Sequence, residues 1–175
     1  MVIKVSPLVH IEVVVPDAEK AYQFLNKIFG AEKVEVEFAE LLSKTNVVKA
    51  LHVKLGNTII QFIEPKVSGT SWADQLEKKG PSVHNLTFLV DDIRQAKKDF
   101  REEGAKVLFQ FRVDWDELFD SEDLRPKVPA VAMIGGEDIV GFKFELSEKP
   151  LKADKVPEKY YDKINIRYSD AEDER

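Results

Sequence analysis

The sequence predicts an α+β fold made of two tandem βαβββ modules, whose curved mixed sheets surround a shared cleft. The first observation is that a strand-like run followed by a helical run opens the 175-residue chain and recurs about halfway along it. The second is the register of this repeat, because aligning Asp17 with Asp92 also aligns Ala21 with Ala96. Each module alone would expose one apolar face of its strands, so the two are expected to pair.

The first module is predicted over residues 1–65. Leu8–Val15 is rich in β-branched residues, which is typical of a strand. Asp17 is the expected N-cap of the following helix and Gly30 its expected end. A Gly-Asn dipeptide at 56–57 predicts a tight turn. The predicted elements are strands at 8–15, 32–39, 46–55 and 58–63 and a helix at 18–29.

Residues 66–82 are predicted to be a linker with a short helix at 71–79, and the second module is predicted over 83–149. Gly135-Gly136 predicts a hairpin turn, and the acidic, aromatic segment 113–125 predicts a loop or helical lid. Residues 150–175 form a charged C-terminal extension whose apolar residues are expected to dock on the body, with disorder expected from 169. The second module's elements are strands at 83–90, 105–111, 128–134 and 139–146 and a helix at 92–103.

Composition restricts the function classes. A hydrophobic content of 43% is typical of a packed globular protein, and a net charge of -6 disfavours nucleic acid as a partner. No apolar run is long enough to span a membrane, and the absence of cysteine excludes disulfides and thiolate metal ligands. The predicted location is the cytoplasm.

Four stretches carry a family resemblance. They are HIEVVVPDAEKAYQFLNKIFGAEKV, VVKALHVKLGNTIIQFIEP, SVHNLTFLVDDIRQAKKDFREEGAKVL and GFKFELSE, and together they cover Leu8 to Glu148. They resemble the vicinal oxygen chelate superfamily, which includes glyoxalase I, bleomycin-resistance proteins, extradiol dioxygenases and methylmalonyl-CoA epimerase. The epimerase branch is the most similar in the order and spacing of its motifs. The resemblance implies a homodimer and a small acid or acyl-CoA substrate.

The resemblance also implies a divalent metal (Co, Mn, Ni, Zn or Fe) held by four side chains. The matching positions are His10, Gln61, Asn85 and Glu145. Asn85 stands where the epimerases carry a histidine, so the metal is expected to be bound weakly or not at all. His84 precedes it, and strand alternation directs the two side chains to opposite faces. A register shift or bulge would instead make His84 a ligand, but a shift would misalign the following helix.

The sequence also departs from the epimerases at the position of the catalytic base. The epimerases are thought to use a glutamate on their third strand, and the matching position here is Ala50. His52 lies two residues on, on the same face of the strand, where an imidazole could act as a general base. His52 and Glu145 are therefore the predicted catalytic residues. The competing interpretations are a plain core or surface histidine at 52 and a salt-bridged carboxylate at 145.

Three functions remain open at this point. The first is a metal-dependent isomerase or epimerase-like enzyme that acts through an enolate. The second is a metal-independent binding module of the resistance type, which Asn85 and Ala50 favour. The third is a non-haem Fe(II) dioxygenase-like enzyme, which needs two histidines and a carboxylate and would have to use His84 with His10 and Glu145.

Overall fold

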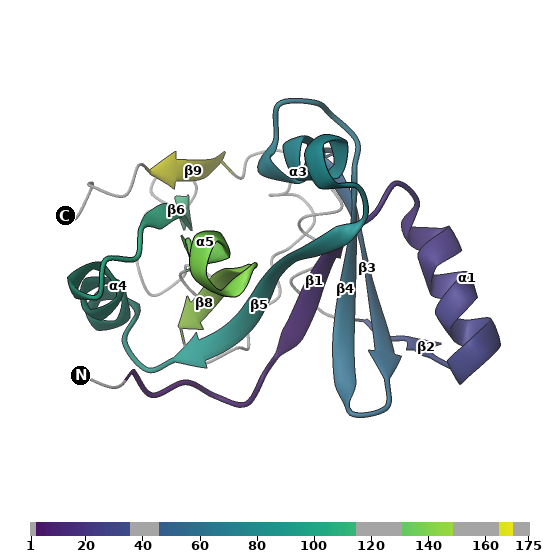
Figure 1. Cartoon of the computed structure of the whole chain (residues 1–175), viewed down its shortest axis with the longest axis horizontal. Coiled ribbons are helices and arrows are strands. Elements are labelled where there is room, and N and C mark those ends of the chain that lie inside the picture. Colours follow the sequence, from purple (N-terminus) through teal and green to yellow (C-terminus); the bar gives the residue numbers. More distant parts are fainter. Residues whose placement is uncertain (1–2, 36–45, 115–130, 149–164, 170–175) are drawn as a thin grey trace. The chain divides into compact units, whose positions relative to one another are not determined.

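The computed structural model describes residues 3–35, 46–114, 131–148 and 165–169 (Figure 1). The chain divides into two compact units. One is Leu8–Thr87, and the other combines Met1–Pro7 with Phe88–Arg175. The division falls inside one strand, near the start of the predicted second module. None of the described helices is long and apolar enough to span a membrane.

The unit Leu8–Thr87 contains a mixed sheet and two helices. Its elements are β1 (His10–Val14), α1 (Ala18–Phe29), β2 (Glu32–Lys33), β3 (Val48–Leu55), β4 (Thr58–Pro65), α3 (Ser71–Lys79) and most of β5 (Ser82–Val90). The strand order is β2-β3-β4-β1-β5. β1 is parallel to β4 and antiparallel to β5, whereas β3 and β4 form the antiparallel hairpin predicted from the Gly-Asn turn.

Helix α1 begins and ends at the predicted residues. Asp17 accepts a hydrogen bond from the backbone N–H of Lys20 at 2.9 Å, and Gly30, at φ 68°, donates its N–H to Asn26. The left-handed φ of Gly30 explains why glycine ends the helix. Residues 36–39 of the predicted strand 32–39 lie outside the described residues, and within the described part the strand is β2, Glu32–Lys33.

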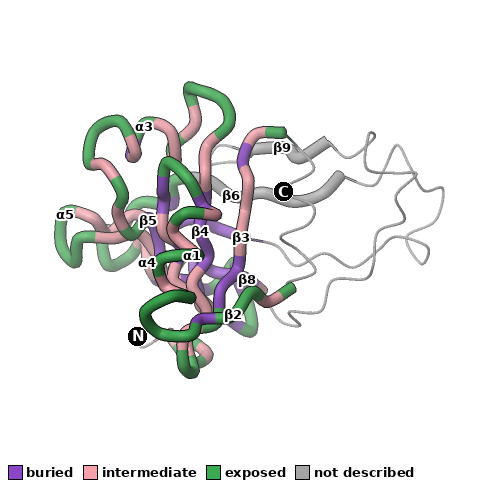
Figure 2. The backbone as a smooth tube through the Cα atoms, turned by 90° about the vertical axis from the view of Figure 1, so that its right-hand side faces the viewer, coloured by how far each residue is buried: buried purple, intermediate pink, exposed green. Residues whose placement is uncertain are grey.

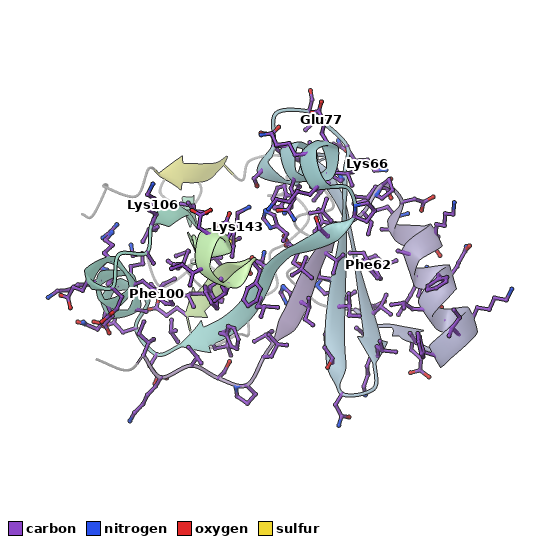
Figure 3. All side chains as sticks on the ribbon, in the orientation of Figure 1. Phe62, Lys66, Glu77, Phe100, Lys106 and Lys143 are labelled. Carbon is purple, nitrogen blue, oxygen red and sulfur yellow. The ribbon has the colours of Figure 1, made fainter. Side chains whose placement is uncertain are left out.

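A hydrophobic core packs between α1 and one face of the sheet. Figure 3 labels Phe62, the β4 residue of this core, and Figure 2 shows buried positions along β3 and β4. Because side chains alternate along a strand, the neighbours His52 and Gln61 point to the opposite face. The buried members of this core are Val15, Ala18, Ala31, Val53 and Phe62.

Glu64 connects β4 to the start of α1. Its carboxylate accepts a hydrogen bond from the Ala18 backbone N–H at 3.1 Å and forms an ion pair with Lys66. A carboxylate at a helix N-terminus interacts favourably with the helix dipole. Although partial burial opposes it, the bonds from Lys66 and Ala18 hold the pKa of Glu64 below its ordinary value.

Glu64→Gln is therefore expected to lower the free energy of unfolding by about 0.5–2 kcal/mol at neutral pH. Because its folded-state pKa is depressed, the carboxylate stabilises the fold above its unfolded pKa, and this contribution is lost as pH falls through the folded pKa. Urea denaturation of both proteins at neutral and acidic pH measures the difference. A difference that does not shrink on acidification would contradict this account.

The second unit contains an antiparallel sheet in the order β8-β7-β6-β9. Its described elements are the end of β5, α4 (Ile93–Glu102), β6 (Val107–Asp114), β7 (Val131–Ile134), α5 (Glu137–Val140), β8 (Lys143–Glu148) and β9 (Asn165–Ser169). Helix α4 packs against β7 and its neighbours around a second core that includes Ile93, Ala96, Ala132 and Leu146. The α+β prediction is confirmed in both units.

The predicted connection between the last two strands of the second module was wrong. The hairpin expected at Gly135-Gly136 is instead a connection through α5, whose Ile139 and Val140 N–H groups donate to the Gly136 carbonyl. The last strand consequently begins at Lys143 rather than at 139. Ser169, where disorder was expected to begin, pairs with Gln110 as the last residue of β9, and the residues that follow lie outside the described part of the chain. Of the predicted loop 113–125, residues 113 and 114 belong to β6, and the rest lies outside the described residues.

Candidate functional site

The three histidines of the chain lie close together in the unit Leu8–Thr87. The rings of His10 and His52 meet edge to face, with their centroids 5.8 Å apart. His84 is joined to the same group through Glu12, whose Oε1 lies 2.6 Å from Nδ1 of His84. We call the following seven residues the histidine cluster: His10, Glu12, His52, Gln61, His84, Asn85 and Thr87.

Strand register brings the cluster together. His52 on β3 lies opposite Gln61 on β4, Gln61 lies beside Glu12 on β1, and Glu12 lies opposite Asn85 on β5. These four residues form a row across four strands on the face of the sheet opposite α1. The next row contains His10, which is paired with Thr87.

A bulge in β5 places His84 in the cluster. Glu12 pairs with Asn85, but the next residue of β1, Val13, pairs with Val83, so His84 is the extra residue on β5. The expectation that His84 and Asn85 point to opposite faces was therefore wrong. The bulge does not change the residue at which α4 begins. Asp92 is its N-cap, as the aligned repeat predicts, and accepts hydrogen bonds from the backbone N–H groups of Arg94 and Gln95.

Glu12 is the functional candidate that the sequence reasoning missed. Its side chain is only 3% exposed, and its Oε1 accepts hydrogen bonds from Nε1 of Trp72 at 2.8 Å and from Nδ1 of His84. Burial alone would raise its pKa, but the His84 bond and charge and the Trp72 N–H hold the pKa of Glu12 below its ordinary value. The sequence did contain a signal for it, because Glu12 is a charged residue within the apolar strand HIEVVV and lies on the same strand face as His10.

Thr87 and Asn85 fix the ring of His10. The Thr87 hydroxyl donates to Oδ1 of Asn85 at 3.1 Å, and its oxygen lies 2.8 Å from Nε2 of His10. Because a hydroxyl has one proton, Nε2 of His10 acts as the donor to Thr87 in this arrangement, which leaves the lone pair on Nδ1. Gln61 also forms a hydrogen bond with the His10 side chain.

Burial keeps two imidazoles neutral at neutral pH. It lowers the pKa of His10, with Glu12 and Gln61 acting in the opposite direction. Burial, with the charge of His10 as a second cause, lowers the pKa of His52 to about 4, again against an opposing effect of Glu12. His52 is 4% exposed, whereas His10 is half-buried, so His10 is the more accessible of the two rings.

The cluster fits the implied metal poorly. Nε2 of His10 and Oδ1 of Asn85 both bond to the Thr87 hydroxyl, so a metal bound through Nε2 of His10 would have to displace that hydroxyl. Asn85 is also fully buried, and an amide oxygen is a weaker ligand than the imidazole it replaces. Across the part of the chain that the structure describes, no group of three or more His, Asp or Glu side chains has the arrangement of a metal site.

Two sequence-predicted positions complete the description. Ala50 lies opposite Ile63, on the same sheet face as His52, and a methyl group there supplies no base. Glu145 belongs to the other unit, where it is half-buried on β8 and pairs with Met133. Its catalytic and metal-binding roles remain predictions.

A family model, the Glyoxalase/Bleomycin resistance protein/Dioxygenase superfamily, matches residues 9–118. The chain belongs to this superfamily. The match includes all the strands that carry the histidine cluster. The resemblance noted in the sequence is therefore confirmed at the level of the superfamily.

Within the superfamily, the chain is similar to methylmalonyl-CoA epimerases. It is 35% identical to the mitochondrial enzyme of Bos taurus over 57% of this chain and 55% of that protein. It is 30% identical to the ethylmalonyl-CoA/methylmalonyl-CoA epimerase of Cereibacter sphaeroides over 59% of this chain and 75% of that protein. The chain thus spans little more than half the length of the mammalian relative.

Solved structures support the superfamily fold. A Streptomyces coelicolor methylmalonyl-CoA epimerase in complex with 2-nitronate-propionyl-CoA superimposes with a TM-score of 0.58 at 20% identity. The match covers 84% of this chain and 99% of that one. A methylmalonyl-CoA epimerase in complex with methylmalonyl-CoA and NH4+ gives a TM-score of 0.60 at 19% identity, over 86% and 100% of the two chains.

Proposed function

We propose that the chain is an epimerase-like enzyme that removes and returns the α-proton of a small acyl-CoA thioester, with methylmalonyl-CoA and ethylmalonyl-CoA as the substrates to test first. The observation that carries this proposal is the histidine cluster, in which neutral His10 and His52 lie edge to face beside a buried carboxylate. Similarity to methylmalonyl-CoA epimerases supplies the substrate class.

The proposed reaction is a reversible proton transfer. The C–H bond at the α-carbon breaks, its proton moves to an imidazole nitrogen, and the electron pair passes to the thioester carbonyl oxygen as an enolate. Return of the proton to the other face of the enolate gives the epimer. His52 is the proposed base, as the sequence predicts, and His10 is the neighbouring ring through which the proton reaches or leaves it.

Glu12 assists by its charge. Its effect on the pKa of both His10 and His52 favours the protonated imidazole. A base that burial has weakened therefore regains part of its strength from a carboxylate that is itself fixed by Trp72 and His84. Thr87 orients the His10 ring, so Thr87 is a positioning residue in this scheme.

Hydrogen exchange tests the proposal. The full chain is incubated with methylmalonyl-CoA in ²H₂O, and deuterium at the α-carbon is followed by NMR. We expect incorporation with the wild type and, for His52→Gln and His10→Gln, much slower incorporation. The double variant should lose little more than either single variant, because residues that act as a unit are not additive. Wild-type exchange no faster than the uncatalysed rate would contradict this proposal for that substrate.

A second candidate is a metal-independent small-molecule binding module. The pKa of about 4 for His52 favours it, because a base of such low pKa is weak, and Ala50 offers no replacement. Saturable binding of acyl-CoA esters without α-proton exchange would select this function.

The homodimer implied by the resemblance belongs to the proposal as well. Light scattering at micromolar concentration is expected to give about twice the 20.0 kDa chain mass. A mass near that of one chain would contradict the proposed homodimer.

A further inference from the structure

We propose that Lys54 binds the α-carboxylate of a malonyl-type thioester and thereby makes the site selective for acyl-CoA esters that carry a carboxylate on the α-carbon. The inference rests on the proposed function and deepens it. It names the residue that distinguishes methylmalonyl-CoA from propionyl-CoA, which lacks this carboxylate. The argument uses only the described residues of the unit Leu8–Thr87.

Lys54 lies on the face of the sheet that carries the histidine cluster. It is two residues beyond His52 on β3, so alternation directs both side chains to the same face. Lys33 pairs with Val53, a member of the α1 core, and therefore points to the other face. Lys49 also points there, because it has the opposite parity to Lys54 on β3. Since this unit contains no arginine, Lys54 is the one cation of its described strands on the cluster face.

Strand register places Lys54 close to both imidazole rings. On β4 it is paired with Ile59, and the parallel register of β1 and β4, extended by one residue, puts Ile59 beside His10. Lys54 and His10 therefore lie in one row, two strands or about 10 Å apart, whereas Lys54 and His52 are about 7 Å apart along β3. The long, flexible side chain of a lysine can bring its ammonium group to an anion held beside either ring.

The exposure of the cluster face increases towards Lys54. Glu12 is buried and bonded to Trp72, so α3 covers one end of the cluster. Figure 1 shows α3 near the end of β4 that is remote from the turn between β3 and β4. Closer to that turn, His52 is buried, His10 is half-buried and Lys54 is exposed. A substrate therefore reaches the two rings from the side of Lys54.

The ammonium group of Lys54 is available to an anion. Lys49 on the same strand forms an ion pair with Glu64. Among the described residues, no ion pair or hydrogen bond joins Lys54 to another side chain, although Glu32 lies directly opposite it on β2. Lys54 can therefore turn to a ligand without breaking a bond within the protein.

The proposed reaction requires a cation at this place. The carboxylate and the transferred proton are attached to the same α-carbon, so the group that binds the carboxylate must lie beside the base. An imidazole that acts as the base is unprotonated and supplies no positive charge. Lys54 supplies this charge, and a charge-assisted hydrogen bond from an ammonium to a carboxylate is among the stronger polar contacts.

The binding of two thioesters that differ only in the carboxylate tests the inference. Isothermal titration calorimetry of the full chain at neutral pH gives Kd for methylmalonyl-CoA and for propionyl-CoA. Both carry the same CoA phosphates, so the ratio of the two Kd values reports the carboxylate alone. We expect the wild type to bind methylmalonyl-CoA at least about fivefold more tightly. Lys54→Met should lose this preference, while its Kd for propionyl-CoA stays within about twofold of the wild type.

Three control variants make the result specific to the charge at this position. Lys49→Met removes a lysine from the opposite face of the same strand and should keep the wild-type ratio. Lys54→Arg keeps the charge and should retain the preference, whereas Lys54→Glu should reverse it. An equal loss of affinity for both thioesters in Lys54→Met, which a contact with a CoA phosphate would give, would overturn the inference. A wild type that binds both thioesters equally, or neither, would overturn it as well.

Deuterium exchange separates the inference from the proposed function. Because the carboxylate stays bound throughout the reaction, Lys54→Met should raise KM for methylmalonyl-CoA at least about fivefold and leave kcat within about threefold. A binding preference that depends on Lys54, without exchange in the wild type, supports the inference and contradicts the proposed function. Exchange in the wild type, with a binding preference that Lys54→Met leaves unchanged, supports the proposed function and overturns the inference.

Discussion

Glu12→Ala is expected to lower the free energy of unfolding by about 3–5 kcal/mol. The substitution removes the acceptor of two buried hydrogen bonds, from Trp72 and from His84, and leaves both donors unsatisfied. It also removes a charge around which β1, β5 and α3 are arranged. Urea denaturation of the full chain, with the midpoint and slope compared between proteins, measures the loss.

Two further variants make this result specific. Glu12→Gln keeps an acceptor oxygen and removes only the charge, so its cost is expected to be about 1–2 kcal/mol. Glu32→Ala changes an exposed glutamate on β2 and should stay within about 0.5 kcal/mol of the wild type. If Glu12→Ala were no more destabilising than Glu32→Ala, the bonds of Glu12 to His84 and Trp72 would contribute nothing to the free energy of unfolding.

His52→Gln is expected to slow α-proton exchange by about 10²–10⁴-fold, the usual contribution of a general base. Glutamine approximates the volume of the ring and keeps polar atoms beside His10, but it accepts no proton near neutral pH. The fold should persist, as judged by circular dichroism and by an unchanged unfolding midpoint. His52→Gln with unaltered exchange would remove His52 as the base.

The pH dependence of the wild type follows from the lowered pKa of His52. A base must be deprotonated to act, so exchange is expected to fall as pH drops through the pKa of about 4 and to be level around neutral pH. An unperturbed histidine would instead give a limb near neutral pH. A limb close to pH 7 that disappears in His52→Gln would mean that burial perturbs this ring less than its surroundings indicate.

Local signals in the sequence were sufficient for most of the fold. Asp17 and Gly30 bound α1 as predicted, because capping and a left-handed end are properties of single residues and their neighbours. The connection after Gly135 was predicted incorrectly because Ile139 and Val140 are β-branched residues in a helical turn, and two backbone bonds to Gly136 outweighed that preference.

The candidate site was predictable only in part. Strand alternation correctly put His52 on the same face as Ala50. The bulge at His84 was not predictable from alternation, because it depends on a tertiary partner, Glu12, more than seventy residues away in the chain. The role of Trp72 as a donor to that carboxylate depends on the packing of α3, which no local pattern specifies.

The central claim is that the histidine cluster transfers the α-proton of an acyl-CoA thioester, and the most direct measurement is deuterium incorporation from ²H₂O into methylmalonyl-CoA. The account predicts wild-type incorporation at the α-carbon that is far above the uncatalysed rate and falls by about 10²–10⁴-fold in His52→Gln. Incorporation at the same rate in wild type and His52→Gln, or none in the wild type under conditions in which it binds the thioester, would contradict it.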